Sequence, residues 1–136
     1  MQKALRIIYT LLECTWGLPQ TVLGFILFIK NRNCAHDVYR GSIRTHWNHK
    51  GGISLGLFIF VNKESRDIEE ISSHEFGHTV QSLFLGPFYL IAVGLPSFIW
   101  CNLSFFKKRR KEKSIPYSAL YCEKWADALG GYYRRA

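Results

Sequence analysis

The segment His74-Glu75-Phe76-Gly77-His78 has the pattern HExxH, which places two metal-ligating side chains four positions apart. On a helix, residues at this spacing lie on one face, so both imidazoles can reach the same metal ion. The intervening Glu75 is then placed to hold a water molecule at that metal. The pattern predicts a hydrolytic zinc site, and the alternative is an ordinary polar helical turn at a surface.

A catalytic zinc ion usually has three protein ligands and keeps one position for water, so a third ligand is needed. The later segment Glu123-Lys124-Trp125-Ala126-Asp127 offers two carboxylates on one helical face. Glu123 is the candidate third ligand. Asp127 is placed to accept the second N–H of His74 or His78, a bond that fixes the imidazole tautomer. Taken alone, this segment favours an ordinary amphipathic helix with two solvated acidic residues, but together with the HExxH motif upstream it favours the ligand role.

The two segments together resemble the gluzincin metallopeptidases, whose pattern is HExxH followed by ExxxD. The layout is closest to the integral-membrane heat-shock and prenyl-protein endopeptidases, in which the second motif is commonly ExxAD and an apolar hairpin separates the motifs. The resemblance covers residues 42–131 in layout, and its specific content is the two motifs. The chain is shorter than typical membrane members and lacks their full set of spanning helices.

The resemblance implies a zinc-dependent endopeptidase that hydrolyses peptide bonds in a polypeptide substrate. It implies Glu75 as the general base and Asp127 as the outer partner of a ligand histidine. It also implies that the strand 53–61 binds extended substrate by pairing at a sheet edge. The implied zinc ligands are His74, His78 and Glu123.

The elements before the first motif are predicted from turn and capping signals. Residues 42–61 form a β-hairpin in this interpretation, with strands at 42–47 and 53–61 joined by a polar, glycine-containing segment. Asp67 and Glu70 form a capping pair, which predicts that the HExxH helix spans 67–85. The polar and basic segment 30–44 is interpreted as a loop.

The second motif is predicted to lie on a helix over 115–130, with Pro116 in its first turn and Gly130-Gly131 at its end. Length and composition favour a single domain over residues 1–136. The expected fold class is α+β. It is a mostly helical, zincin-like domain with a small antiparallel β-hairpin or sheet and two apolar helical hairpins.

The apolar segments 5–29 and 83–106 are the candidates for these hairpins. The second has no charged residue and is long enough for one transmembrane helix. A single crossing would separate the two motifs across the bilayer, so we expect the segment to turn back at Gly94-Leu95-Pro96. Gly17-Leu18-Pro19 divides the first segment in the same way, which predicts two half-depth or internally packed hairpins. A conventional crossing by residues 5–29 is the alternative.

The charge balance favours an anionic partner, because 18 lysines and arginines face 10 acidic residues and the formal net charge is +8. Six of the seven residues at 107–113 are basic and directly follow apolar sequence. This order favours anionic phospholipid over nucleic acid, for which the sequence has no fold signature. The same basic residues predict a membrane location with the active site facing the cytoplasm. No cleavable signal sequence and no CxxC pairing of cysteines is evident.

Three functional interpretations follow from the sequence. The first is a membrane-associated zinc metallopeptidase, in which Tyr117, Tyr121, His46 or His49 stabilises the oxyanion. The second is a non-catalytic membrane protein in which a fourth ligand such as Cys122 or His46 closes a structural zinc site. The third is a basic, membrane-bound interaction module without metal. Substrate identity and oligomeric state stay open at this point.

Overall fold

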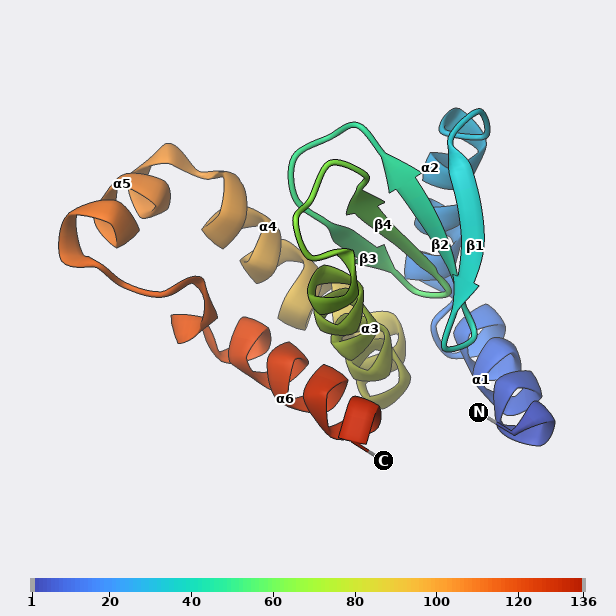
Figure 1. Cartoon of the computed structure of the whole chain (residues 1–136). Coiled ribbons are helices and arrows are strands. Elements are labelled where there is room, and N and C mark those ends of the chain that lie inside the picture. Colours follow the sequence, from blue (N-terminus) through green and yellow to red (C-terminus); the bar gives the residue numbers. More distant parts are fainter. Residues whose placement is uncertain (1, 136) are drawn as a thin grey trace.

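The structure is a computed structural model that describes residues 2–135, and the side chains of residues 2–131. Within residues 2–135 the chain forms a small four-stranded mixed sheet with helices around it, which confirms the predicted α+β class (Figure 1). The strands are β1 (Ala35–Tyr39), β2 (Ser42–Trp47), β3 (Ile53–Leu55) and β4 (Phe58–Asn62). The helices are α1 (Lys3–Thr15), α2 (Leu18–Lys30), α3 (Ile68–Leu85), α4 (Leu95–Asn102), α5 (Ser104–Lys113) and α6 (Tyr121–Arg135), with short helical turns at Gly86–Phe88, Leu90–Gly94 and Tyr117–Ala119.

The sheet has the strand order β1-β2-β4-β3, in which β2 and β4 are parallel and both outer pairs are antiparallel. The predicted pairing of 42–47 with 53–61 as a hairpin is therefore wrong. Gly56, with a φ angle of 61°, divides the second segment into β3 and β4, which pair with each other. β4 takes an inner position because its apolar residues, such as Ile59 and Phe60, are fully buried, as expected for a strand covered on both faces.

Strand β1 lies within the segment 30–44, which was predicted as a loop. Arg40 and Gly41 have φ angles of 50° and 96°, and they form the tight turn that joins β1 to β2. β1 is an edge strand and mostly exposed. It therefore lacks the alternation of apolar and polar residues by which a half-buried strand is recognised.

Helix α3 confirms the predicted HExxH helix and lies between the sheet and α6 (Figure 1). At its start the Asp67 side chain accepts a hydrogen bond of 2.9 Å from the backbone N–H of Glu70. At its end Gly86 has a φ angle of 55°. Phe76 belongs to the aromatic core against the sheet, with its ring centroid 6.0 Å from that of Tyr9. The opposite side of α3 faces α6, so one helix connects the hydrophobic core to the second motif.

Helix α6 differs from the predicted helix over 115–130 at both ends. Pro116 has an extended conformation and a short 3₁₀ turn follows it, so α6 begins at Tyr121. Gly130 does not end α6 but lies in tight contact with α3. A Cβ atom added at Gly130 would lie 2.1 Å from the carbonyl oxygen of Ser73. The glycine is therefore required by close helix packing and not by a helix end.

Each apolar segment forms a bent pair of helices. α1 and α2 meet at 95° around Trp16-Gly17, as predicted for the first segment. In the second segment the bend of 68° lies at Leu103, between residues 90–102 and α5, and the predicted turn at Gly94-Leu95-Pro96 is wrong. Pro96 lies in the first turn of α4, where a proline needs no hydrogen-bond partner for its nitrogen. No single helix within residues 2–135 has the length and apolar content to cross a bilayer.

Residues 86–120, here called the arm, join α3 to α6. The arm projects from the side of the molecule opposite to α1 and α2, and its outer end is α5 (Figure 1). The basic run 107–113 is part of α5. From this outer end the chain returns to α6, which lies along α3. The arm therefore leaves the body of the protein and comes back to it between the two motifs.

Helices α1 and α2 bury polar residues and expose apolar ones, which is the reverse of a helix on a soluble protein. Glu13 and Gln20 are fully buried and meet at the hydroxyl of Ser82 on α3. The Ser82 hydroxyl donates to Glu13 at 2.8 Å and accepts from Gln20 at 2.7 Å. The outward apolar side chains of both helices are each 41–59% exposed, and they are Leu5, Ile7, Ile8, Leu11, Leu12, Trp16, Leu18, Val22, Leu23, Phe25, Ile26 and Ile29.

Candidate metal centre

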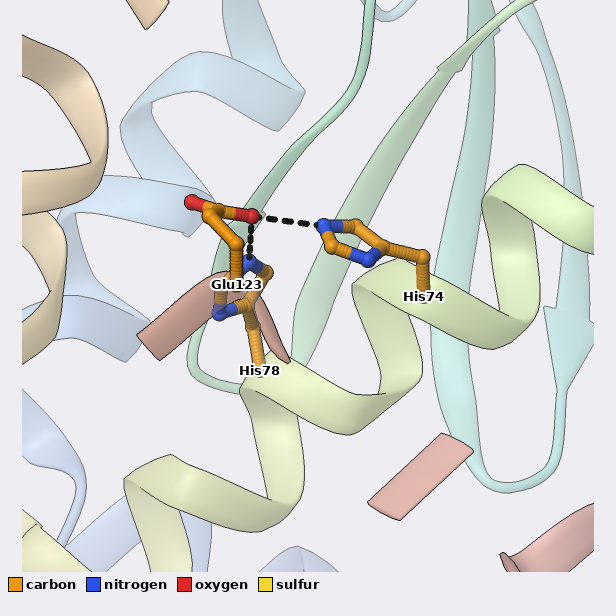
Figure 2. Close-up of side chains that lie close together, drawn as sticks. All are labelled: His74, His78 and Glu123. Carbon is orange, nitrogen blue, oxygen red and sulfur yellow. Dashed lines mark hydrogen bonds and ion pairs between the residues drawn. The ribbon is translucent and has the colours of Figure 1, made fainter. Parts of the chain in front are cut away.

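Three side chains from α3 and α6 converge on one point (Figure 2). The Oε2 atom of Glu123 lies 2.9 Å from Nε2 of His74 and 3.3 Å from Nε2 of His78. One ligand atom from each of the three residues lies within 4.8 Å of the other two. His74, His78 and Glu123, here called the metal centre, form a group that could hold a metal ion, and these are the residues that the sequence motifs indicated.

The outer nitrogen of each histidine donates to a fixed acceptor. Nδ1 of His74 lies 2.6 Å from Oδ1 of Asp127, the partner predicted from the sequence. Nδ1 of His78 lies 2.7 Å from Oε1 of Gln81, whose amide nitrogen donates to the carbonyl oxygen of Cys122 at 2.8 Å. Because Nδ1 of each histidine faces an acceptor, Nε2 is the nitrogen left to face Glu123, and it can ligate a metal ion once it has lost its proton.

Two of the three separations in the metal centre, those from Glu123 to the two histidines, are close to the separations in a four-coordinate metal site. Ligand atoms at the corners of a tetrahedral zinc site with bonds of about 2.0–2.1 Å lie about 3.3 Å apart. The observed separations of 2.9 and 3.3 Å between Glu123 and the two histidines are close to this value. Two imidazoles and one carboxylate also form a donor set that leaves room for a fourth ligand.

Close packing of α3 on α6 brings the two motifs together. A Cβ atom added at Gly77 would lie 1.9 Å from the carbonyl oxygen of Ala126, so only glycine permits the observed approach. Gly130 makes the corresponding contact with Ser73 one turn away on each helix. Gly77 occupies a variable position of HExxH, between Glu75 and His78. The short distance between the helix axes places Glu123 within reach of both imidazoles.

The second carboxylate oxygen of Glu123 is held by the arm. Oε1 accepts a hydrogen bond from the hydroxyl of Ser97 on α4. Glu123 is fully buried, so this bond satisfies the oxygen that does not face the histidines. Ser97 therefore fixes the rotation of the carboxylate and ties the arm to the metal centre.

The metal centre has electrostatics that favour a cation. Burial alone would lower the pKa of His74, but the hydrogen bond to Glu123, the charge of Glu75 and the hydrogen bond to Asp127 raise it to about 10. Burial would raise the pKa of Glu123, but the bonds from His74 and His78 hold it well below its usual range. A metal ion bound here competes with the proton on His74, so its affinity rises with pH.

Glu75 lies beside the metal centre in the wall of a cavity. This cavity has a volume of about 830 Å³ and opens between β3 and the arm, with His74, Glu75 and His78 in its wall. Burial raises the pKa of Glu75, which brings it closer to the range of an effective general base. A Cβ atom added at Gly52 would lie 2.6 Å from Oε1 of Glu75, so a glycine lets the loop before β3 cover this carboxylate.

The structure distinguishes between the two tyrosines that are candidate oxyanion donors, Tyr117 and Tyr121. Tyr117 lines the cavity, with its ring centroid 6.4 Å from that of His74. Tyr121 is 58% exposed and its hydroxyl donates to the carbonyl of Ala92, so it does not reach the cavity and its prediction as an oxyanion donor is wrong. Tyr121 lies two positions before the start of the motif and points outward from the first turn of α6, which sequence spacing alone does not reveal.

Neither predicted histidine of the sheet region reaches the cavity. His46 lies on β2 and pairs with Asp37 at 3.3 Å, and His49 packs against Trp47 at a ring-centroid distance of 4.8 Å. Cys122 is buried, and its carbonyl oxygen accepts from Gln81. Among the side chains of residues 2–131, the group of close metal-ligating atoms contains only the three residues of the metal centre.

Gln81 and Ser97 were missed by reasoning from the sequence. Gln81 follows His78 by three positions and so shares its helical face, a signal that could have found it. Ser97 belongs to an apolar segment far from both motifs, and no sequence signal connects it with Glu123.

The comparisons with known proteins give no relative from which to transfer a function. No protein-family model matches the chain, and neither a curated protein nor a solved structure matches it. The description of the site therefore rests on the residues and geometry given above.

Proposed function

We propose that the protein is a zinc-dependent metallopeptidase of gluzincin type, with His74, His78 and Glu123 as the zinc ligands. The observation that carries this proposal is the convergence of two Nε2 atoms and one carboxylate oxygen beside a buried glutamate in an open cavity. Two imidazoles and a carboxylate with one open position form the donor set of catalytic zinc sites.

The proposed reaction assigns a separate task to each residue. Zinc, when bound, lowers the pKa of a coordinated water and polarises the scissile carbonyl. Glu75 takes a proton from the attacking water and later donates it to the leaving amine. Asp127 and Gln81 hold the imidazole tautomers through the outer nitrogens. Tyr117, whose ring lies in the cavity wall, is the candidate donor to the oxyanion.

The edge strand β3 supports a polypeptide as the substrate. β3 is an outer strand of the sheet, and all of its residues, Ile53–Leu55, line the cavity. An outer strand can pair with an extended peptide, and on β3 the carbonyl oxygen of Ser54 already accepts a hydrogen bond of 3.3 Å from the hydroxyl of Tyr89. A peptide added to this edge would pass in front of Glu75 and the metal centre.

The structural-zinc alternative requires a fourth protein ligand, which the side chains of residues 2–131 do not supply. The two candidates were Cys122 and His46. Cys122 is absent from the group of converging ligand atoms, and His46 pairs with Asp37 on the sheet. The open position favours catalysis over a purely structural site.

Metal analysis tests this function directly. We expect purified protein to contain about one zinc ion per chain and to hydrolyse an unfolded polypeptide such as denatured casein. Removal of zinc with 1,10-phenanthroline should abolish hydrolysis, and added zinc should restore it. Hydrolysis that persists without bound metal would contradict the proposal, and so would protein that binds no zinc at micromolar concentration.

We further propose that the protein acts at a membrane surface, with α1 and α2 inserted into one leaflet. The support is the reversed burial of these helices, whose polar residues face the protein and whose apolar residues face outward. Each helix has 13 residues, or about 20 Å. Inserted with the bend first, the 95° pair would reach a depth of about 14 Å, roughly half of the hydrocarbon core.

Charge complementarity supports anionic lipid as the occupant of this surface. Lys3 and Arg6 lie at the outer end of α1, and Lys30 and Arg32 lie at the outer end of α2. These residues would reach the headgroups when the bend lies in the hydrocarbon. The basic run 107–113 on α5 adds a second cationic region. Since basic residues predominate on the cytoplasmic side of membranes, the proposed orientation puts the cavity in the cytoplasm.

Vesicle binding tests the membrane proposal. Replacing Lys107, Lys108, Arg109 and Lys111 by Gln is expected to weaken binding to vesicles that contain phosphatidylserine by about 10²- to 10³-fold, because each charge contributes about 1 kcal/mol. Binding is measured by vesicle flotation at low and high salt. The matched control replaces four exposed cations elsewhere, namely Lys50, Lys63, Arg66 and Lys124.

Vesicle binding and analytical ultracentrifugation together distinguish lipid from a second copy of the chain as the partner of the apolar face. Equal loss of binding in the two quadruple variants would contradict a specific role for α5. A stable dimer by analytical ultracentrifugation, together with no vesicle binding by the unaltered protein, would assign the apolar face of α1 and α2 to a second copy.

A further inference from the structure

The cavity extends past the metal centre along an apolar wall. Part of this wall comes from β3 and part from the arm. Leu95 and Phe98 of the arm are 56% and 60% exposed although they line the cavity, so their side chains are open to whatever enters it. The apolar residues of the wall are Ile53, Leu55, Leu90, Leu95 and Phe98.

The cavity contains no lysine or arginine among its lining residues, although the formal net charge of the chain is +8. Apart from Glu75, its acidic side chains are Glu70 and Asp127. Away from His74 and His78, this combination repels a carboxylate and offers no lysine or arginine to pair with one. The lining therefore favours an apolar side chain and disfavours an acidic one.

Gly94 leaves space in the part of the cavity wall that the arm forms. It lies inside the helical stretch 90–102, where glycine is destabilising relative to alanine. A Cβ atom added there would meet no atom closer than 3.5 Å, and that nearest atom is Cδ2 of Leu90. Neither a positive φ angle nor a close backbone contact thus requires glycine at this position. The missing side chain enlarges the cavity.

The position of this wall relative to the metal centre is fixed. Ser97 lies next to Phe98 on α4 and donates to Oε1 of Glu123. The wall is therefore attached to a metal-ligating residue through one hydrogen bond. Phe98 is the chain neighbour of the residue that holds the Glu123 carboxylate, and both Ser97 and Phe98 line the cavity.

We propose that Leu90, Gly94 and Phe98 form a subsite for a large apolar side chain next to the scissile bond. The subsite excludes aspartate and glutamate. This inference rests on the proposed peptidase function, and it names the substrate class as polypeptides with an apolar residue at the cleavage position.

Hydroxamate-capped dipeptides that differ in one side chain test the subsite. Affinities for the zinc-loaded protein are measured by calorimetry. Burial of an aromatic side chain predicts that the phenylalanine probe binds about 10- to 100-fold more tightly than the glycine probe. The aspartate probe should bind no better than the glycine probe. Equal affinity for all three probes would overturn the proposal.

A cavity-filling variant locates the effect. In Gly94→Leu the preference for phenylalanine over glycine should fall below about 3-fold, because the new side chain occupies the space at Gly94. The matched control is Gly131→Leu on α6, where an added Cβ meets no atom within 4 Å, and which should keep the full preference. An unchanged preference in Gly94→Leu would assign the selectivity to another part of the cavity.

A measurement without zinc separates this inference from the proposed function. A short peptide that carries benzoylphenylalanine is photo-cross-linked to the unaltered protein and to Gly94→Leu, and the sites are mapped by mass spectrometry. We expect cross-links within residues 90–98 that are lost in Gly94→Leu, with or without bound zinc. Cross-links spread over the surface would contradict the subsite, whereas the zinc content alone reports on the peptidase proposal.

Discussion

Replacing Glu75 by Gln is expected to leave about one zinc ion per chain bound and to lower peptide hydrolysis about 10²- to 10⁴-fold. Gln has nearly the same shape as Glu but cannot accept a proton from water. Glu75 is not among the three converging ligands, so the metal centre should survive the substitution. Zinc content is measured by elemental analysis, and hydrolysis is measured on denatured casein.

Two companion variants make this result specific. His78→Ala removes a ligand and should lose both zinc and hydrolysis. Glu69→Gln makes the same chemical change as Glu75→Gln on the same helix, at a side chain that is 71% exposed and outside the cavity, so it should change neither quantity. Full hydrolysis by the Glu75→Gln variant would contradict the assignment of Glu75 as the general base. Equal zinc content in His78→Ala and the unaltered protein would remove the metal centre itself.

Replacing Gly77 by Ala is expected to distort the metal centre and to lower the stability of the protein, although it adds only one methyl group. The added Cβ would lie 1.9 Å from the carbonyl oxygen of Ala126, so α6 must move away from α3. Alanine gains up to about 1 kcal/mol over glycine through helix propensity. Overpacking costs about 1–3 kcal/mol, so the net effect should be a lower free energy of unfolding. Glu123 moves with α6, so zinc affinity should fall as well.

A glycine on α6 provides the control for the Gly77 variant. At Gly131 an added Cβ meets no atom within 4 Å, so Gly131→Ala should retain zinc and raise the thermal unfolding temperature. Gly130→Ala, whose Cβ would lie 2.1 Å from the carbonyl oxygen of Ser73, should behave like the Gly77 variant. Thermal unfolding and zinc content are measured for all three proteins. If Gly77→Ala keeps zinc and stability, helix contact does not set the distance between the motifs.

Several features of the fold could be predicted because they depend on neighbours in the sequence. The capping pair Asp67 and Glu70 determined the start of α3, and Gly86 determined its end. The spacing of His74 and His78 determined that their side chains share a face. Capping bonds and helical faces involve residues up to four positions apart, so they can be identified from a short segment.

Other features failed because they depend on burial and on pairing between distant segments. The pattern of residues 53–61 indicated a strand correctly, but the pattern could not show that Gly56 divides it or that β4 pairs in parallel with β2. Gly130-Gly131 resembles a helix end in sequence, whereas in the fold Gly130 is a contact point with Ser73. A local pattern does not state which other segment a residue will meet.

For the metal centre, the sequence by itself singled out the three candidate ligand residues, the outer partner Asp127 and the candidate general base Glu75. Only the tertiary structure brought Glu123 to the two histidines, 45 and 49 positions away, and added Gln81 and Ser97. The physical reason is that residue type and helical spacing fix which atoms can ligate, whereas the distance between two helices is set by side-chain volume where they touch. At Gly77 that volume is a single hydrogen atom.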